Sequence, residues 1–162
     1  MKKQLLSVAL LALAGTLAFT SCKKDDDGGS NSASAKENLT TGQWRMTANS
    51  VTTSMSGGGS STNDVFATYD ACEKDDLTKF EAAGGVTVDE GASKCNSSDP
   101  QSYSAGTWAL ENNNATLALT DGSTERFKID ELNSASLKIS KDTTITSGPL
   151  SITTSIKINF VK

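Results

Sequence analysis

From residue 38 onward, apolar residues alternate with polar ones, and this two-residue period constrains the fold more than any other feature of the sequence. Side chains on a β-strand point alternately to opposite faces, so the period predicts half-buried strands rather than amphipathic helices. Turn signals recur about every ten residues, among them Asp121-Gly122 and Ser147-Gly148-Pro149. We therefore expect one antiparallel all-β domain that closes into a barrel or sandwich. The residues expected to share strand faces are Trp44, Met46 and Ala48; Val65, Ala67 and Tyr69; Trp108 and Leu110; Leu117 and Leu119; Phe127 and Ile129; Leu137, Ile139 and Ile145; and Leu150, Ile152, Ile156, Ile158 and Phe160.

One stretch, residues 70–83, fits two structures. It is rich in helix formers and ends at Gly84, a residue that often follows the last turn of a helix, so local propensity favours a helix. As a strand it would place Thr78 and Phe80 on one face before a turn at Gly84. Pattern and propensity disagree here, and both alternatives stay open.

Residues 1–21 have the layout of a secretory signal peptide. A positive start, Met1-Lys2-Lys3, precedes an apolar run over residues 5–19, which is short for a hydrocarbon core about 30 Å thick. Ser21-Cys22 resembles a lipobox in the looser form of Bacteroidota lipoproteins, although Phe19 stands where Leu is usual. The resemblance implies cleavage before Cys22 and lipidation of Cys22, and two or more acyl chains anchor a protein stably. The alternatives are a short N-terminal membrane helix and an ordinary secreted protein.

Residues 22–37 are expected to form a flexible tether. Residues 28–37 are rich in Gly, Ser, Asn and Ala, with no periodicity and no bulky apolar side chain. The charged run at residues 23–27, Lys-Lys-Asp-Asp-Asp, resembles the export signal that sends Bacteroidota lipoproteins to the outer face of the outer membrane. We expect a lipid-anchored protein exposed at the cell surface, with a folded domain over residues 38–162.

Charge and composition argue against several functions. Without the first 21 residues, thirteen basic side chains face nineteen acidic ones, a net charge of −6 that disfavours nucleic-acid binding. The chain contains no histidine, the usual metal ligand and general base near neutral pH. Acidic residues concentrate between Asp70 and Glu90, but their spacing fits no EF-hand loop, so we expect a solvated acidic face rather than a Ca²⁺ site. Neither a metal, a cofactor nor an enzymatic activity is expected.

Two cysteines remain once Cys22 is set aside. Cys72 and Cys95 permit one intramolecular pairing, and export would place them in an oxidising compartment. Without histidine or a Cys-x-x-Cys motif, a metal or redox role is the weaker alternative. We therefore expect a Cys72–Cys95 disulfide.

Several motifs together resemble the lipocalin-like domains of Bacteroidota lipoproteins. Gly42-Gln-Trp44 is similar to the Gly-x-Trp start of that family, and the resemblance continues through Cys72, the segment 75–80, Cys95 and Gly106-Thr-Trp108. It implies an eight-stranded up-and-down antiparallel barrel. It also implies that residues 75–80 form a strand and that Cys72 pairs with Cys95.

The resemblance implies a binding module for a small apolar or amphipathic ligand, because an eight-stranded barrel is wide enough for one such molecule. The alternative is a filled barrel that acts as an interaction or accessory protein of an envelope complex. For both tryptophans, core packing is the alternative to ligand contact. A separate motif, Asp142-Thr143-Thr144, resembles an O-glycosylation acceptor, with Thr143 as the acceptor residue. The residues expected to face a ligand are Trp44, Met46, Phe80, Trp108, Phe127, Ile139 and Ile156.

Overall fold

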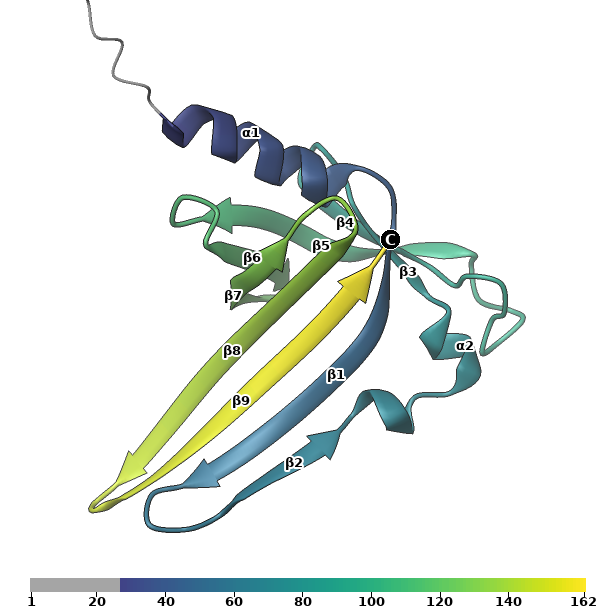
Figure 1. Cartoon of the computed structure of the whole chain (residues 1–162). Helices are drawn as coiled ribbons and strands as arrows, with labels where there is room; N and C mark the ends of the chain where they lie inside the picture. Colours follow the sequence, from purple (N-terminus) through teal and green to yellow (C-terminus); the bar gives the residue numbers. More distant parts are fainter. Residues whose placement is uncertain (1–26) are drawn as a thin grey trace, which may run out of the picture.

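The computed structural model describes residues 27–162, which form a strand-rich domain with one long helix (Figure 1). The predictions for the signal peptide and for lipidation at Cys22 lie outside the described residues. Within the described part, no helix is both long and apolar enough to cross a membrane. The elements are α1 (Asp27–Thr40), β1 (Trp44–Met55), β2 (Ser60–Asp64), the 3₁₀ turn η1 (Phe66–Thr68), α2 (Ala71–Lys74), β3 (Leu77–Phe80), β4 (Gly85–Asp89), β5 (Ser102–Glu111), β6 (Thr116–Asp121), β7 (Ser123–Leu132), β8 (Ser136–Ser147) and β9 (Leu150–Val161).

The strands form a closed antiparallel barrel, which confirms the predicted fold. Each strand from β3 to β8 pairs with the next strand along the chain, and β1 pairs with both β3 and β9. The eight strands β1 and β3–β9 therefore make an up-and-down barrel without an open edge at the closure. The ninth strand, β2, is an addition that lies along the outer half of β1.

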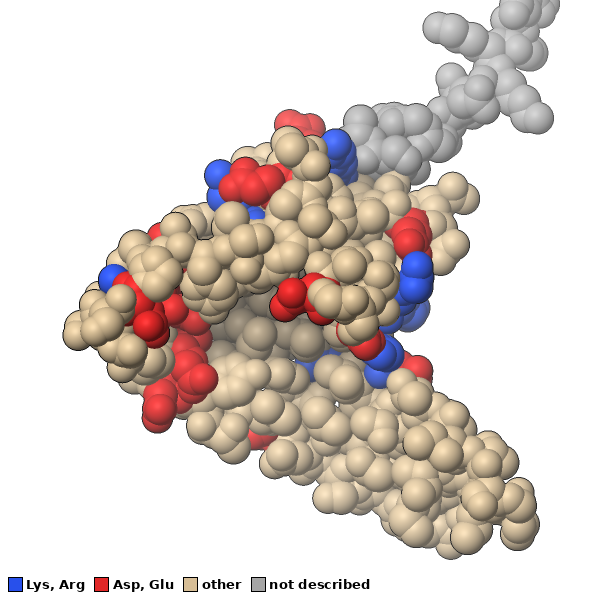
Figure 2. Space-filling model, turned by 180° about the vertical axis from the view of Figure 1, so that it is seen from behind, with Lys and Arg blue, Asp and Glu red and all other residues tan. Residues whose placement is uncertain are grey.

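The barrel is narrow at one end and splayed at the other. β3 pairs with β1 only at Trp44 and Arg45. Further along the same edge of β1, from Ser50 to Ser54, the hydrogen-bonded partner is β2 instead. Beyond Arg45 the walls therefore separate, and the sheet β2-β1-β9-β8 extends away from the other strands (Figure 1). From behind, the space between the two parts is a hollow in the surface (Figure 2).

The buried core lies at the narrow end, under α1. Trp44 is completely buried, and its indole Nε1 donates a hydrogen bond of 2.8 Å to the carbonyl oxygen of Leu39. The Lys162 ammonium lies 4.5 Å from the centroid of the Trp44 ring, a cation–π contact. The tryptophan thus joins the start of β1, the end of α1 and the end of the chain. The other buried hydrophobic residues of this core are Leu39, Phe80, Val86, Leu117, Leu137, Ile139 and Phe160.

The prediction of a flexible tether over residues 28–37 was wrong, because this segment belongs to α1. The prediction rested on the lack of a bulky apolar residue in that range. Leu39, just beyond it, is fully buried against the barrel, and the bond from Trp44 holds its carbonyl. Docking of the helix end supplies the tertiary contact that a helix of weak local propensity needs.

The chain between β1 and β4 also differs from the prediction. Val65, Ala67 and Tyr69 do not share a strand face, because η1 occupies Phe66–Thr68. The strand in this part of the chain is β2, which precedes the predicted one. β2 is exposed along its whole length, so it lacks the alternating apolar residues by which a half-buried strand is recognised. Of the ambiguous residues 70–83, Ala71–Lys74 form one turn of helix, α2, and Leu77–Phe80 form β3. The strand that the family resemblance implied over residues 75–80 is thus present but begins two residues later.

Candidate functional site

The interior of the barrel contains an apolar cavity of about 240 Å³. Its wall comes from seven strands, because the inward-facing residues of β1, β3, β4, β5, β6, β8 and β9 converge there. Thr78 is the only hydroxyl-bearing residue among the ten that line it, so the cavity suits a hydrocarbon group. The lining residues are Met46, Thr78, Phe80, Val86, Val88, Ala105, Leu119, Ile139, Ile158 and Phe160.

Toward the splayed end the apolar cavity continues into a polar space of about 270 Å³, here called the mouth. The two spaces share Met46, Thr78 and Val88. The remaining residues that line the mouth are two carboxylates and two phenols, Glu73, Asp76, Tyr69 and Tyr103. A molecule lying across both spaces would meet an apolar floor and a polar, acidic rim.

The structure brings three of the residues predicted to face a ligand into the cavity wall: Met46, Phe80 and Ile139. Trp44 lies below the cavity in the sealed core and does not line it. Phe127 lines an adjoining hollow of about 280 Å³ between β5, β6 and β7.

Ile156 lies on β9 opposite Lys141 and Val51, two residues nearer the splayed end than the cavity residue Ile158. Thr143, the predicted glycosylation acceptor, is exposed within β8. Neither residue is among those that line the cavity or the mouth. Their predicted roles stay predictions.

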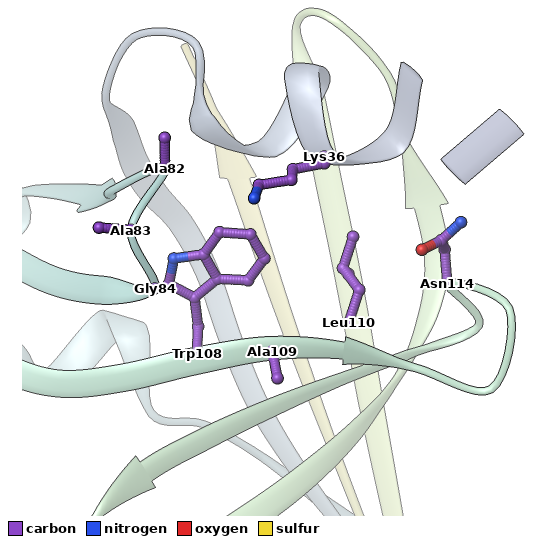
Figure 3. Close-up of a pocket in the computed structure, with 8 residues that line it drawn as sticks. All are labelled: Lys36, Ala82, Ala83, Gly84, Trp108, Ala109, Leu110 and Asn114. Atoms are coloured by element: carbon purple, nitrogen blue, oxygen red, sulfur yellow. The ribbon is translucent and has the colours of Figure 1, made fainter. Parts of the chain in front are cut away.

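Trp108 lies at a different surface, a groove of about 370 Å³ between α1 and β5 (Figure 3). Its indole Nε1 donates a hydrogen bond of 2.9 Å to the carbonyl oxygen of Glu81, which fixes the ring against the β3–β4 turn. The ring also meets Phe80 edge to face, with centroids 6.1 Å apart. Trp108 therefore supports the cavity wall through Phe80, while its own outer side faces the groove with Lys36 and Leu110.

Some wall residues were not singled out by the sequence as ligand contacts. The sequence predicted inward positions for Leu119, Ile158 and Phe160. The alternation of apolar and polar residues does not, however, tell which inward residues border empty space. Ala105 carried no signal at all, because a small residue in a strand is not distinguished by hydropathy alone. Its small side chain leaves room in the cavity.

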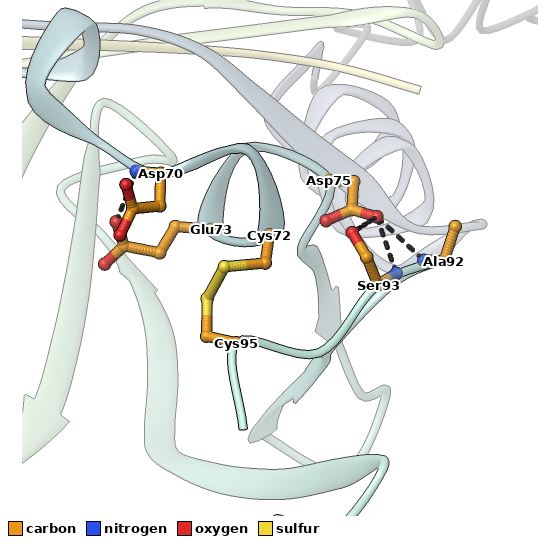
Figure 4. Close-up of a disulfide and its surroundings, with 7 residues drawn as sticks. All are labelled: Asp70, Cys72, Glu73, Asp75, Ala92, Ser93 and Cys95. Atoms are coloured by element: carbon orange, nitrogen blue, oxygen red, sulfur yellow. Dashed lines mark hydrogen bonds between the residues drawn. A yellow bond between two sulfur atoms is a disulfide. The ribbon is translucent and has the colours of Figure 1, made fainter. Parts of the chain in front are cut away.

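One side of the mouth is fixed by a disulfide between Cys72 of α2 and Cys95 (Figure 4), which confirms the predicted pairing. Asp70 and Glu73 form a capping box at the start of α2. Oδ2 of Asp75 accepts hydrogen bonds from the backbone of Ala92 and from the backbone and hydroxyl of Ser93, each 2.9 Å long. These hydrogen bonds lower the pKa of Asp75 below its ordinary value, and the bond from the Ser93 hydroxyl has the largest effect.

Asp76, one residue further along, has the opposite electrostatic setting. Burial raises the pKa of its carboxyl to about 6, and the negative charges of Glu90, Asp75, Glu73 and Asp89 add to this effect. Burial also raises the pKa of Tyr103 across the mouth, with the nearby charges of Asp76 and Glu90 contributing. Charge on Asp76 is therefore unfavourable in the folded protein.

Asp76→Asn is expected to stabilise the protein at pH 7.5 by about 1 kcal/mol, less than the full pKa shift implies because the carboxyl is partly exposed. Since the folded pKa lies above the ordinary value of 3.8, the stabilisation that Asp76 offers is present below about pH 4 and is lost as the pH rises through 6. Urea unfolding of both proteins at pH 4 and pH 7.5 measures the effect. An equal difference in stability at the two pH values would contradict it.

The acidic residues near the mouth do not gather around a common point. Among residues 27–162, no three acidic or cysteine side chains lie close enough together to hold a metal ion. Asp89 accepts hydrogen bonds from the Gly91 backbone and the Gln101 amide, both 3.0 Å long. The arrangement can bind and orient a ligand by shape and charge, through an apolar floor and a rim of acceptors.

Comparison with known proteins places this geometry in a wider group. Residues 41–139 match a family model described as a lipocalin-like domain. The match begins three residues before β1 and ends within β8 at Ile139, so it covers the strands that supply most of the cavity wall and the whole mouth. No protein with a curated description matches the chain.

Proposed function

Since this chain belongs to the family of lipocalin-like domains, we propose that its barrel binds a small apolar or amphipathic molecule. The observation that carries the proposal is the apolar cavity of about 240 Å³, open to a polar mouth. A barrel of eight strands has room either for its own side chains or for one small ligand, and here part of the interior is unfilled. The proposal is a binding role without catalysis, and the chain contains no histidine that could serve as a general base.

Native mass spectrometry of the protein purified from its host tests this role directly. Ala105→Phe is expected to abolish retention of a co-purified molecule, because the added ring would occupy the cavity that Ala105 borders. Ala109→Phe, an exposed position on the same strand whose side chain points out of the barrel (Figure 3), serves as the matched control and should retain the molecule. Equal retention by the two variants would place the ligand outside the barrel.

We also propose that the protein is an outer-membrane lipoprotein, anchored through acyl chains on Cys22 and exposed at the cell surface. The apolar run ending at Ser21-Cys22 and the charged run after it support this location. α1 begins at Asp27, so little chain separates the proposed anchor from the domain. The barrel would then lie close to the membrane, with α1 between it and the lipid.

Cys22→Ala is expected to move the protein from the membrane fraction to the soluble fraction, because no acyl chain could be attached. Membrane fractionation followed by immunoblotting measures the distribution. Cys72→Ala, which removes a different cysteine, should leave the protein in the membrane fraction. If the Cys22 variant stayed with the membrane, another anchor would be responsible.

A second candidate function is docking to an envelope protein, and one surface favours it. Residues 50–63 and 143–156, here called the outer lobe, carry no charged side chain. They form the ends of the two hairpins at the splayed end of the barrel, and this region lacks red or blue atoms in Figure 2. Met55, Ile145, Leu150 and Ile152 are exposed there, with Ile145 69% exposed. Exposed apolar groups gathered in one place are typical of a protein-interaction surface.

A photo-crosslinking amino acid at Leu150 would test docking in intact cells. Docking predicts a discrete crosslinked species from this position and none from Ser134, an exposed residue in the β7–β8 turn at the narrow end. Crosslinks of equal yield at both positions would indicate non-specific contact.

A further inference from the structure

The two carboxylates that line the mouth, Glu73 and Asp76, take part in no ion pair within the described residues. The ion pairs within residues 27–162 include none of the residues that line the cavity or the mouth. They join Lys79 to Glu81, Arg126 to Glu111, Lys128 to Asp130, Lys138 to Glu131 and Lys141 to Glu125. No cation of the described part of the chain therefore pairs with the negative charge in the mouth.

Within the mouth, Asp76 is the carboxylate that lacks a partner. The side chain of Glu73 accepts a hydrogen bond of 2.7 Å from the Asp70 backbone, so it serves to cap α2. Oδ1 of Asp76 is buried, and among the described residues no donor reaches it. A buried acceptor without a donor is uncommon and calls for a group that satisfies it.

A second unsatisfied acceptor lies beside the same wall. Asn49 donates from Nδ2 to the hydroxyl oxygen of Tyr69, which lines the mouth, over 3.1 Å. Its Oδ1 is buried and has no donor among residues 27–162. The strand register places Asn49 opposite Ile158 of the cavity wall, so both residues face the interior.

We propose that the barrel is selective for amphipathic amines, with the apolar part of the ligand in the cavity and its ammonium group at Asp76. This inference rests on the proposed binding function and names the class of ligand. An ammonium group carries three donors and a positive charge, so it matches the carboxylate of Asp76, which has an unsatisfied oxygen, and the unsatisfied amide oxygen of Asn49 beside the same wall. A fatty acid would bring a like charge toward Asp76, Glu73 and the neighbouring Glu90, which disfavours it.

The methionines of the chain give a direct readout of binding. Met46 borders both the cavity and the mouth, whereas Met55 is 51% exposed on the outer lobe. The full chain, labelled with ¹³C at the methionine methyl groups, would be titrated at pH 7.5 with n-hexylamine, n-hexanol and n-hexanoate. These probes share a six-carbon chain and differ in the head group. We expect hexylamine to shift the Met46 resonance with an affinity about tenfold above that of hexanol, and hexanoate to bind more weakly than either.

Two isosteric variants with the same change in net charge separate the role of Asp76 from general electrostatics. Asp76→Asn is expected to reduce the preference for hexylamine over hexanol to within about twofold. Asp142→Asn, on the outer face of β8, is the control and should keep the full preference.

The outcomes distinguish this inference from the proposed function. Equal binding of the three probes, or tighter binding of hexanoate, would overturn the selectivity for amines while the binding function stood. Loss of the preference in both variants would overturn the assignment to Asp76. If none of the probes shifted Met46, or if they shifted Met55 alone, the binding role of the barrel would itself fail.

Discussion

Trp44→Ala is expected to lower the free energy of unfolding by about 3–5 kcal/mol, the range for removing a fully buried large aromatic side chain. Trp44 is 0% exposed, and its indole makes the hydrogen bond to Leu39 that holds the end of α1 on the barrel. The substitution therefore leaves a cavity at the narrow end and frees the helix. Urea unfolding followed by far-UV circular dichroism measures the loss.

Trp108→Ala provides the comparison for the same change of residue. Trp108 is only half-buried, although its indole also donates to a backbone carbonyl. We expect a loss of about 1–2 kcal/mol for this variant, because less apolar surface leaves a buried environment. Equal losses in the two variants would show that Trp44 is not the central core residue that its burial indicates.

Replacing both Cys72 and Cys95 with serine is expected to cost about 3 kcal/mol, the loop-closure contribution for a separation of 23 residues. The disulfide joins α2 to the loop after β4, so the variant should also have a less ordered mouth around Asp76. Unfolding by urea gives the stability, and hydrogen exchange of the backbone amides of Ala92 and Ser93, which bond to Asp75, reports the local order.

The reducing agent dithiothreitol supplies the control for this variant. Treated wild-type protein should unfold at the same urea concentration as the double-serine variant, and the variant itself should not respond to the reductant. If the reductant left the wild-type stability unchanged while the variant was destabilised, packing of the serine side chains rather than loss of the cross-link would be the cause.

The sequence was most informative where strands are buried on one face only. The alternation in β7 and in the last part of β9 predicted inward residues correctly, because one face of the strand packs on the core there and the other meets water. Leu150 and Ile152, at the start of β9, are exposed because the strand extends past the core at the splayed end. β2 was not predicted, because a strand exposed along its whole length has no apolar face. α1 was not predicted either, because Leu39, which packs the helix against the barrel, lies outside the segment whose composition indicated a tether.

The candidate site was predictable only in outline. The alternation of side chains along the strands identified inward residues such as Met46 and Ile139. Trp44 and Phe127 were also predicted to point inward, but they do not line this cavity. The mouth depends on a feature that the alternation of inward and outward side chains along the strands does not reveal. One helical turn held by a disulfide places Asp76 beside Tyr103, which lies 27 positions away in the sequence.

Closure of the barrel through β1 and β9 sets an order on its folding. The pairs that join these strands, from Arg45–Val161 to Met55–Ile152, link segments roughly 100 residues apart, whereas most other strands pair with a close neighbour in sequence. In a chain that emerges from a ribosome or a translocation channel with its N-terminal part first, β1 can pair with β2, but the edge of β1 that faces β9 must stay unpaired until β9 is free. Local hairpins such as β6–β7 can form early, and the slow kinetic step should be the return of the C-terminal strand to β1.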